Sequence, residues 1–171
     1  ARTLVLSVFG YLDISVIDEF PKGRKPIQTV HNRDAHRLKV FGFLAKEMGK
    51  GRQVYIVYPL IEESEKLDYK ALMVGYESIR RRFPEVQVSI VHGKMKAEAK
   101  DYEMQRFIRK ETKIMVATTV IEVGVNVPNA SVMVIENAEK FGLSQLHQLR
   151  GRVGSVVEQS YCILMTFYKL T

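Results

Sequence analysis

Short apolar runs rich in valine and isoleucine alternate along this chain with longer segments of helical period. Such alternation is typical of strands that are connected by helices into a parallel sheet. The strands that we expect are 27–31, 53–58, 87–91, 113–117, 132–136 and 160–165. The pattern therefore places the chain in the α/β class, with a mainly parallel central sheet.

The segments between these strands have the spacing of helices. In the first segment, apolar residues recur on one helical face, an acidic residue stands near the start, and a glycine stands just past the end. These residues are Leu38, Phe41, Ala45, Met48, Asp34 and Gly51. Two further helices are expected at about 69–83 and 97–109. No internal repeat interrupts this order, which indicates a single domain.

The size and charge of the chain narrow its class further. Its 171 residues, 46% hydrophobic and 26% charged, suffice for one sizeable core. Lys and Arg number 26 against 19 Asp and Glu, and the net charge of +7 favours a polyanionic partner. Charge alone is a weak indication of nucleic-acid binding, because many basic proteins bind none.

Cysteine, histidine and apolar residues exclude several kinds of site. Cys162 is the single cysteine and lies in an apolar run, so we expect a buried thiol in a reducing compartment. The four histidines show no metal-ligand spacing. No apolar stretch approaches the roughly 18 residues that span a bilayer, and the first residues lack a signal-peptide pattern. We expect a cytoplasmic protein with no metal site and no membrane partner.

Residues 145–155, QLHQLRGRVGS, combine glutamine, arginine and glycine in a suggestive order. If a helix starts at Ser144, Gln148 and Arg152 lie one turn apart on an outward face, and Leu146 belongs to a packing face. A guanidinium beside a glutamine suits a triphosphate, because its rigid donors can follow the charge on a transferred phosphoryl group. A lone pair of this kind is more often the solvated face of an amphipathic helix.

Polar residues also follow two of the expected strands, where ligands of parallel α/β sheets collect. Thr118 and Thr119 could hold a nucleic-acid phosphate through hydroxyl and backbone N–H groups, although two threonines after a strand are more often a turn or a helix cap. His92, Gly93 and Lys94 follow another strand. Glycine permits close backbone approach there, and lysine supplies a point charge for phosphate.

An acidic pair near the start of the chain has the form of a magnesium-binding strand end. Asp18 and Glu19 close the run ISVIDE, which is similar to a Walker B segment. Its partner is missing from the sequence, because no GxxxxGKS/T occurs in it. We therefore interpret the pair as structural or hinge residues and assign no β- and γ-phosphate cradle to this chain.

Four blocks resemble, in order, motifs of superfamily 2 helicases. They are YIVYPLIEES (55–64), VHGKM (91–95), ATTVIEVGVNVPNA (117–130) and LSQLHQLRGRVG (143–154). The chain is most similar to the RecG family of branched-DNA helicases, which residues 12–29 favour over the related Mfd family. The resemblance implies a RecA-like three-layer sandwich over 31–171, the helicase C-terminal domain, with a segment 1–30 that leads into it.

The resemblance also implies roles for residues at matching positions. Glu122 could couple the nucleotide and DNA sites. Those near ATP would be Gly124, Asn126, Gln148 and Arg152, of which Gln148 and Arg152 would be catalytic. Those on the DNA backbone would be Thr118, Thr119, His92, Gly93 and Lys94. Many relatives carry aspartate in place of Asn126, so the amide weakens the expected ribose contact.

Ser155 departs from the family pattern, in which motif VI normally ends in an arginine. That arginine is an arginine-finger candidate, and by analogy its absence could cost roughly a thousandfold in turnover, or about 4 kcal/mol. Arg152 is retained and could partly serve. Val156 also stands where relatives often have glycine, so the loop after Gly154 differs from the family as a whole.

The function implied is that of the second motor lobe of an ATP-dependent helicase that remodels stalled replication forks and Holliday junctions in recombination and repair. Its partners would be branched or double-stranded DNA and the first RecA-like lobe and wedge domain of the same parent chain. The first lobe would bind most of the ATP with Mg²⁺, so this chain alone should lack ATPase activity. An Mfd-like translocase and a non-catalytic basic nucleic-acid-binding module remain as alternatives.

Overall fold

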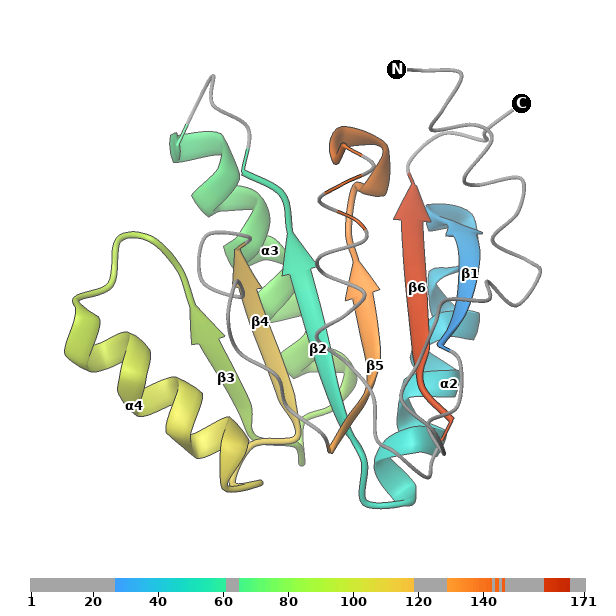
Figure 1. Ribbon diagram of the computed structural model, residues 1–171, viewed down its shortest axis with the longest axis horizontal. Coiled ribbons are helices and arrows are strands. Elements are labelled where there is room, and N and C mark those ends of the chain that lie inside the picture. The colour runs from blue at the N-terminus through green and yellow to red at the C-terminus, as the bar shows by residue number, and fades with distance from the viewer. Residues whose placement is uncertain are drawn as a thin grey trace.

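The structure is a computed structural model that describes residues 27–60, 65–118, 129–142, 144, 146 and 159–166. Within these ranges, six parallel strands form one sheet with helices against both of its faces (Figure 1). The expected α/β class with a parallel central sheet is therefore confirmed. Among the described residues, no helix has the length and apolarity required to span a membrane.

All six expected strands are present, with small shifts at their ends. They are β1 (Gln28–Arg33), β2 (Gln53–Tyr58), β3 (Val88–Val91), β4 (Ile114–Thr118), β5 (Ala130–Ile135) and β6 (Tyr161–Thr166). Their order across the sheet is β1-β6-β5-β2-β4-β3. Every residue of β2 is buried, as expected for an apolar run inside a sheet that is covered on both faces. Residues 28–30, the last three of the expected leading segment, already belong to the sheet.

The three expected helices are confirmed as well. They are α2 (Arg37–Gly49), α3 (Glu65–Arg82) and α4 (Ala97–Ile108), with short 3₁₀ turns η1 (Asp34–His36) and η2 (Ala138–Lys140). The buried face of α2 matches the expected stripe only in part: Phe41 and Met48 pack against the core, but Leu38 is 76% exposed and Ala45 is exposed. Val40 and Leu44 are buried as well. The apolar residues of α2 fit two overlapping helical stripes, and only contact with the sheet selects between them.

The helices divide into two layers. On one face of the sheet, α2 and α3 contribute Leu44 and Leu72 to a core with the inward side chains of β2, β4, β5 and β6. On the other face, α4 contributes Phe107 to a second core, which also includes Cys162 and Leu146. The thiol of Cys162 is buried, as expected. The sheet is thus the middle layer of three. The side on which its strands begin is called the amino edge below, and the side on which they end is called the carboxyl edge.

Buried polar side chains close the amino edge, where the strands begin. Gln53 Nε2 donates hydrogen bonds to the carbonyl oxygens of Phe107 and Thr112 at 2.6 and 2.7 Å. Asn129 Nδ2 donates in turn to Gln53 Oε1 at 2.8 Å. These bonds join the starts of β2 and β5 to the end of α4, and they satisfy amide and carbonyl groups that burial would otherwise leave unpaired.

Neighbouring strands bring distant residues together at the carboxyl edge. β3 pairs with β4, and β4 pairs with β2, with Val91 opposite Ala117 and Tyr58 opposite Thr118. The strands are parallel and end at the same edge, so the residues that follow β2 and β3 flank the last residue of β4. The sheet order therefore creates a shared location for the polar residues that the sequence singled out.

Candidate nucleic-acid interface

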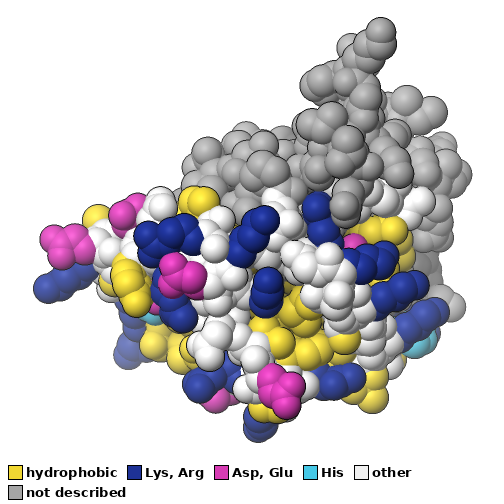
Figure 2. Space-filling model, turned by 90° about the horizontal axis from the view of Figure 1, so that it is seen from below, with side chains coloured by type: hydrophobic (Ala, Val, Ile, Leu, Met, Phe, Trp, Pro, Cys, Tyr) yellow, Lys and Arg dark blue, Asp and Glu magenta, His cyan; other side chains and the backbone are white. Residues whose placement is uncertain are grey.

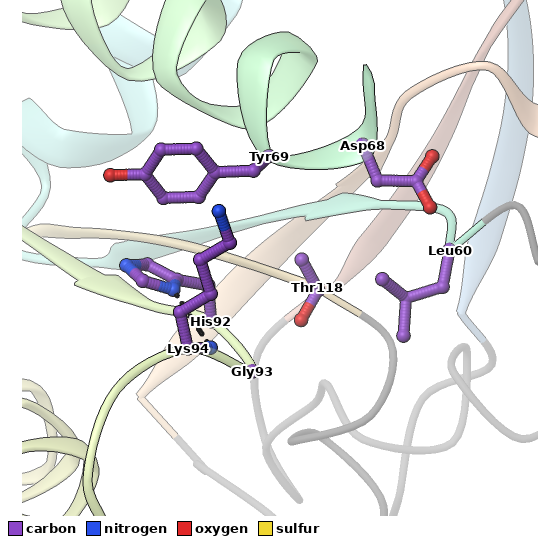
Figure 3. Close-up of a pocket in the computed structure, with 7 residues that line it drawn as sticks. All are labelled: Leu60, Asp68, Tyr69, His92, Gly93, Lys94 and Thr118. Carbon is purple, nitrogen blue, oxygen red and sulfur yellow. Dashed lines mark hydrogen bonds between the residues drawn. The ribbon is translucent and has the colours of Figure 1, made fainter. Parts of the chain in front are cut away.

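A cleft of about 290 Å³ lies at the carboxyl edge, where β2, β3 and β4 end beside the start of α3. Its walls come from the ends of the three strands and from the first turns of the helix (Figure 3). The residues that line it are Leu60, Asp68, Tyr69, His92, Gly93, Lys94 and Thr118. Four of the five residues predicted to contact DNA, His92, Gly93, Lys94 and Thr118, therefore meet in one cleft. Their contact with DNA stays a prediction.

Thr118 contributes a buried hydroxyl to this cleft. The residue is 3% exposed, and its Oγ1 atom has no hydrogen-bond partner in the part of the chain that the structure describes. A buried hydroxyl without a partner is unfavourable by about 1–3 kcal/mol. A phosphate oxygen in the cleft would supply the missing acceptor. Such a ligand would explain the hydroxyl at position 118, which the stability of the fold does not explain.

Lys94 contributes the positive charge. Its Nζ atom lies 4.4 Å from the centre of the Tyr69 ring, which is within the range of a cation–π contact. No carboxylate of a described residue forms a salt bridge with Lys94. A Cβ atom added at the adjacent Gly93 would meet no atom within 4 Å, so packing does not demand glycine there. Because no described carboxylate pairs with it, the ammonium of Lys94 remains available for an anion.

His92 connects the end of β3 to the turn that carries Lys94. Its Nδ1 atom accepts a hydrogen bond from the backbone N–H of Lys94 at 3.2 Å. Burial, with the charges of Lys94 and Lys100, lowers the pKa of His92. The neutral ring that this bond requires carries its proton on Nε2, which can act as a donor. The imidazole therefore orders the turn that carries Lys94.

Tyr69, Asp68 and Leu60 were missed as lining residues by the sequence analysis. Leu60 follows the YIVY run, so its position after a strand was a usable signal. Tyr69 marked only the expected start of a helix, and nothing in its neighbourhood indicated contact with His92. The two rings lie 4.9 Å apart in an edge-to-face arrangement, although the residues come from different elements.

A cluster of charged side chains lies at the same carboxyl edge, nearer to β5. Arg37 donates to both carboxylate oxygens of Glu136, at 2.6 and 2.7 Å, and also to Asp34. The hydrogen bonds to Glu136 hold the pKa of Arg37 above its usual value. Burial and the nearby Glu136 likewise raise the pKa of the Tyr58 hydroxyl, which stays protonated. Sequence analysis missed this ion pair, whose partners are 99 residues apart.

The predicted nucleotide site lies outside the described residues. This applies to Gly124, Asn126, Gln148 and Arg152, and also to Thr119, Glu122, Ser155, Asp18 and Glu19. Leu146 is described and buried, in agreement with its expected packing face. Across the ranges that the structure covers, no group of three or more His, Cys, Asp or Glu residues could hold a metal ion.

Positive charge by itself does not locate the interface. Figure 2, which looks onto the side where the strands begin, shows Lys and Arg side chains scattered among acidic and apolar ones. The cleft at the opposite edge is distinguished by the combination of Lys94 with the unpaired hydroxyl of Thr118. Geometry is therefore more informative here than net charge.

Residues 36–156 match the family described as the helicase conserved C-terminal domain. The chain belongs to this family. The ATP-dependent DNA helicase RecG of Synechocystis is 52% identical over 166 residues, which are 96% of this chain and 20% of that protein. RecG of Aquifex aeolicus is 51% identical over 164 residues, which are 96% of this chain and 21% of that protein. This helicase domain thus spans about a fifth of these relatives.

Solved helicase structures agree with this assignment. RecG bound to a three-way DNA junction has a TM-score of 0.72 and 43% identity, covering 96% of this chain and 21% of that chain. Mss116p DEAD-box helicase domain 2 bound to an RNA duplex has a TM-score of 0.63 at 16% identity, covering 81% of this chain and 53% of that chain, and shows the fold alone. The resemblance of this helicase domain to RecG and its RecA-like fold are confirmed.

Proposed function

We propose that this chain is the second motor lobe of an ATP-dependent helicase that resembles RecG and remodels stalled forks and Holliday junctions in recombination and repair. One observation carries the proposal: four residues predicted to contact DNA line one cleft, in a chain similar over 96% of its length to a RecG bound to a three-way DNA junction. Branched or double-stranded DNA is accordingly the proposed partner.

The cleft can hold a phosphate of the DNA backbone without reading its sequence. The Lys94 ammonium would supply a charge, the Thr118 hydroxyl a hydrogen bond, and the His92 Nε2–H group a further donor. All three contacts are made to phosphate oxygens, which are the same at every base pair. A translocating motor requires this kind of grip, because it must release one phosphate and take the next regardless of sequence.

ATP with Mg²⁺ is the proposed cofactor of the whole protein. Gly124, Asn126, Gln148 and Arg152 would be the contribution of this lobe to its site, with Gln148 and Arg152 catalytic and Glu122 and Thr119 linking that site to DNA. The phosphate cradle would come from the first lobe, because this sequence contains no GxxxxGKS/T. When bound, ATP supplies the free energy that changes the contact between lobes.

The remaining partners belong to the same parent chain. A first RecA-like lobe and a fork-recognising wedge domain would complete the motor, since this chain covers only 20–25% of its curated relatives. We place the protein in the cytoplasm, with no membrane partner. The segment 1–30 would lead into this lobe, which would occupy 31–171.

The test is ATP hydrolysis by the parent protein on forked and on linear duplex DNA. We expect strong stimulation by the fork, and loss of that stimulation in a Lys94→Met variant whose basal hydrolysis persists. The 171-residue chain alone should hydrolyse no ATP, because it lacks the phosphate cradle. Equal stimulation by both DNAs, or turnover by the chain alone, would contradict the proposal. A preference for stalled RNA polymerase would indicate the Mfd-like alternative.

A non-catalytic binding module is the second candidate, and Ser155 is the observation that favours it. Restoring the family residue in a Ser155→Arg variant distinguishes the two functions. A gain of roughly a thousandfold in turnover would show that the site is catalytic and that Ser155 impairs it. The binding module would be supported if neither the original protein nor Ser155→Arg hydrolyses ATP, and if the salt dependence of DNA binding is the same with and without ATP.

A further inference from the structure

We infer that Tyr69 is a positioning residue, which holds the ammonium of Lys94 ready for a DNA phosphate at the cleft. The inference rests on the proposed DNA-binding function and adds a residue that none of the helicase motifs contains. Figure 3 shows the Lys94 side chain extended beneath the Tyr69 ring, at the side of the cleft that β3 forms. The Nζ atom lies 4.4 Å from the ring centre.

The ring of His92 contacts the tyrosine ring and also bonds to the backbone of Lys94. Tyr69 lies in the first turns of α3, and its ring meets the His92 ring at 4.9 Å and an interplanar angle of 73°. His92 in turn accepts the backbone N–H of Lys94. The side chain and the backbone of Lys94 are therefore both ordered by the same pair of rings, which come from α3 and from the end of β3.

Packing of the fold does not account for the tyrosine. Tyr69 belongs to neither hydrophobic core, and α3 packs on the sheet through Leu72 and Ile79, with Phe83 directly after its end. The Tyr69 side chain remains partly exposed beside the cleft. Its described ring contacts are those with His92 and Lys94, which both line the cleft. Tyr69 therefore acts on the proposed phosphate site.

Charge in the cleft explains why such a residue is useful. Asp68 also lines the cleft, and Figure 3 shows its carboxylate directed away from the Lys94 ammonium. A lysine side chain has a long flexible stem, and an ion pair with Asp68 would cancel the charge that a phosphate needs. The face of the tyrosine ring attracts the ammonium more weakly than a phosphate does. The ring can therefore order Lys94 and still release the ammonium to a phosphate.

The inference is tested by binding of fluorescein-labelled forked DNA to the 171-residue chain over a series of salt concentrations. Tyr69→Leu removes the ring and should weaken binding about two- to fivefold. Tyr69→Phe keeps the ring without the hydroxyl and should restore the affinity of the original chain. Because Tyr69 acts through Lys94, Tyr69→Leu should have almost no effect in a chain that already carries Lys94→Met.

The same titrations separate this inference from the function on which it rests. If Lys94→Met neither weakens binding nor lowers the salt slope by about 1, the proposed phosphate contact fails and the role of Tyr69 falls with it. If Lys94→Met has both effects but Tyr69→Leu binds as tightly as the original chain, or more tightly, the inference alone is overturned. Equal effects of Tyr69→Leu with and without Lys94 would also overturn it, because they would indicate a general loss of structure.

A nuclear magnetic resonance measurement reports the contact directly. The Nζ atom of Lys94 lies over the Tyr69 ring, so the resonances of the adjoining ε-methylene protons should be shifted upfield in the original chain and in Tyr69→Phe. The shift should be absent in Tyr69→Leu and should diminish as forked DNA is added. An upfield shift that DNA leaves unchanged would show that the ammonium stays on the ring, and would overturn the inference.

Discussion

Two groups of polar side chains, one at each end of the central strands, differ in how they are paired. At the amino edge, Gln53 and Asn129 bond to each other and to buried carbonyl groups. At the carboxyl edge beside β4, the Thr118 hydroxyl is equally buried but has no partner among the described residues, and Lys94 has an aromatic ring in place of a carboxylate. Polar groups that satisfy one another stabilise the fold, whereas an unsatisfied hydroxyl in a cleft requires another explanation, such as the proposed contact with a phosphate.

The carboxyl edge itself is not uniform. Near β5, Arg37 and Glu136 form a double hydrogen bond that closes the edge in the manner of the amino side. Near β3 and β4, a cleft remains, and it is lined by Lys94 and by the buried Thr118, whose hydroxyl has no described partner. Burial alone therefore does not identify a binding site, because Thr118 and Glu136 are both nearly inaccessible. The two residues differ in that Glu136 is paired with Arg37, whereas the Thr118 hydroxyl has no described partner and lines a cleft beside Lys94.

The largest effect on stability is expected at Gln53. Gln53→Met keeps the length of the side chain but removes the described donor to the Thr112 carbonyl group and one of two described donors to that of Phe107, which still accepts the backbone N–H of Lys110. We expect a loss of about 3 kcal/mol in the free energy of unfolding, measured by urea denaturation. A change below about 1 kcal/mol would show that the amino edge is not held by this network, and the contrast between the edges would disappear.

Arg37 should have the next largest effect. Arg37→Met leaves the carboxylate of Glu136, which is 5% exposed, without its partner. Since Arg37 is partly exposed, we expect about 2 kcal/mol of destabilisation in urea. Adding Glu136→Gln should recover much of this loss. If the double variant is less stable than Arg37→Met, the pair does not act as a unit.

Thr118→Val is the matched opposite of Gln53→Met, because it also replaces a buried polar group with an apolar one. The hydroxyl has no partner to lose within the described structure, so the free energy of unfolding should change by less than about 1 kcal/mol. DNA affinity should fall by about fivefold or more with an unchanged salt slope, because a hydrogen bond is lost but no charge. Destabilisation as large as that of Gln53→Met would contradict the comparison.

The smallest effect concerns the pH dependence of His92. Burial and two nearby lysines lower its pKa in the folded chain, so the unfolded chain takes up a proton first as the pH falls. The stability that the neutral ring contributes is complete above about pH 6.5 and is lost as the pH falls toward the lowered pKa. His92→Asn keeps an acceptor for the backbone of Lys94 but does not titrate.

The measurement for His92 is the difference in unfolding free energy between the original chain and His92→Asn, from pH 7.5 to pH 5. That difference should shift in favour of the variant as the pH falls, because His92 is the only position at which the two proteins differ. A difference that does not vary with pH would show that the contact of His92 with the Lys94 backbone is not sensitive to protonation.

Much of the lining of the cleft could be predicted from the sequence, because parallel strands end at a common edge. His92 and Thr118 each follow or end an apolar run, and the prediction that both lie at the ligand-binding edge needed only that rule. Their convergence on one cleft depends on β3 and β4 being neighbours, which the sheet order decides. Tyr69 could not be predicted, because its partners lie on a different element.

The sequence by itself determined the α/β class, the strands and helices in order, the buried thiol of Cys162 and the resemblance to superfamily 2 helicases. Each of these depends on residues that are close together in the chain. Tertiary structure alone decided which stripe of α2 is buried, that Arg37 meets Glu136, and that Tyr69 holds Lys94. The physical reason is that such contacts form between side chains far apart in sequence, and the order of strands in the sheet brings them together.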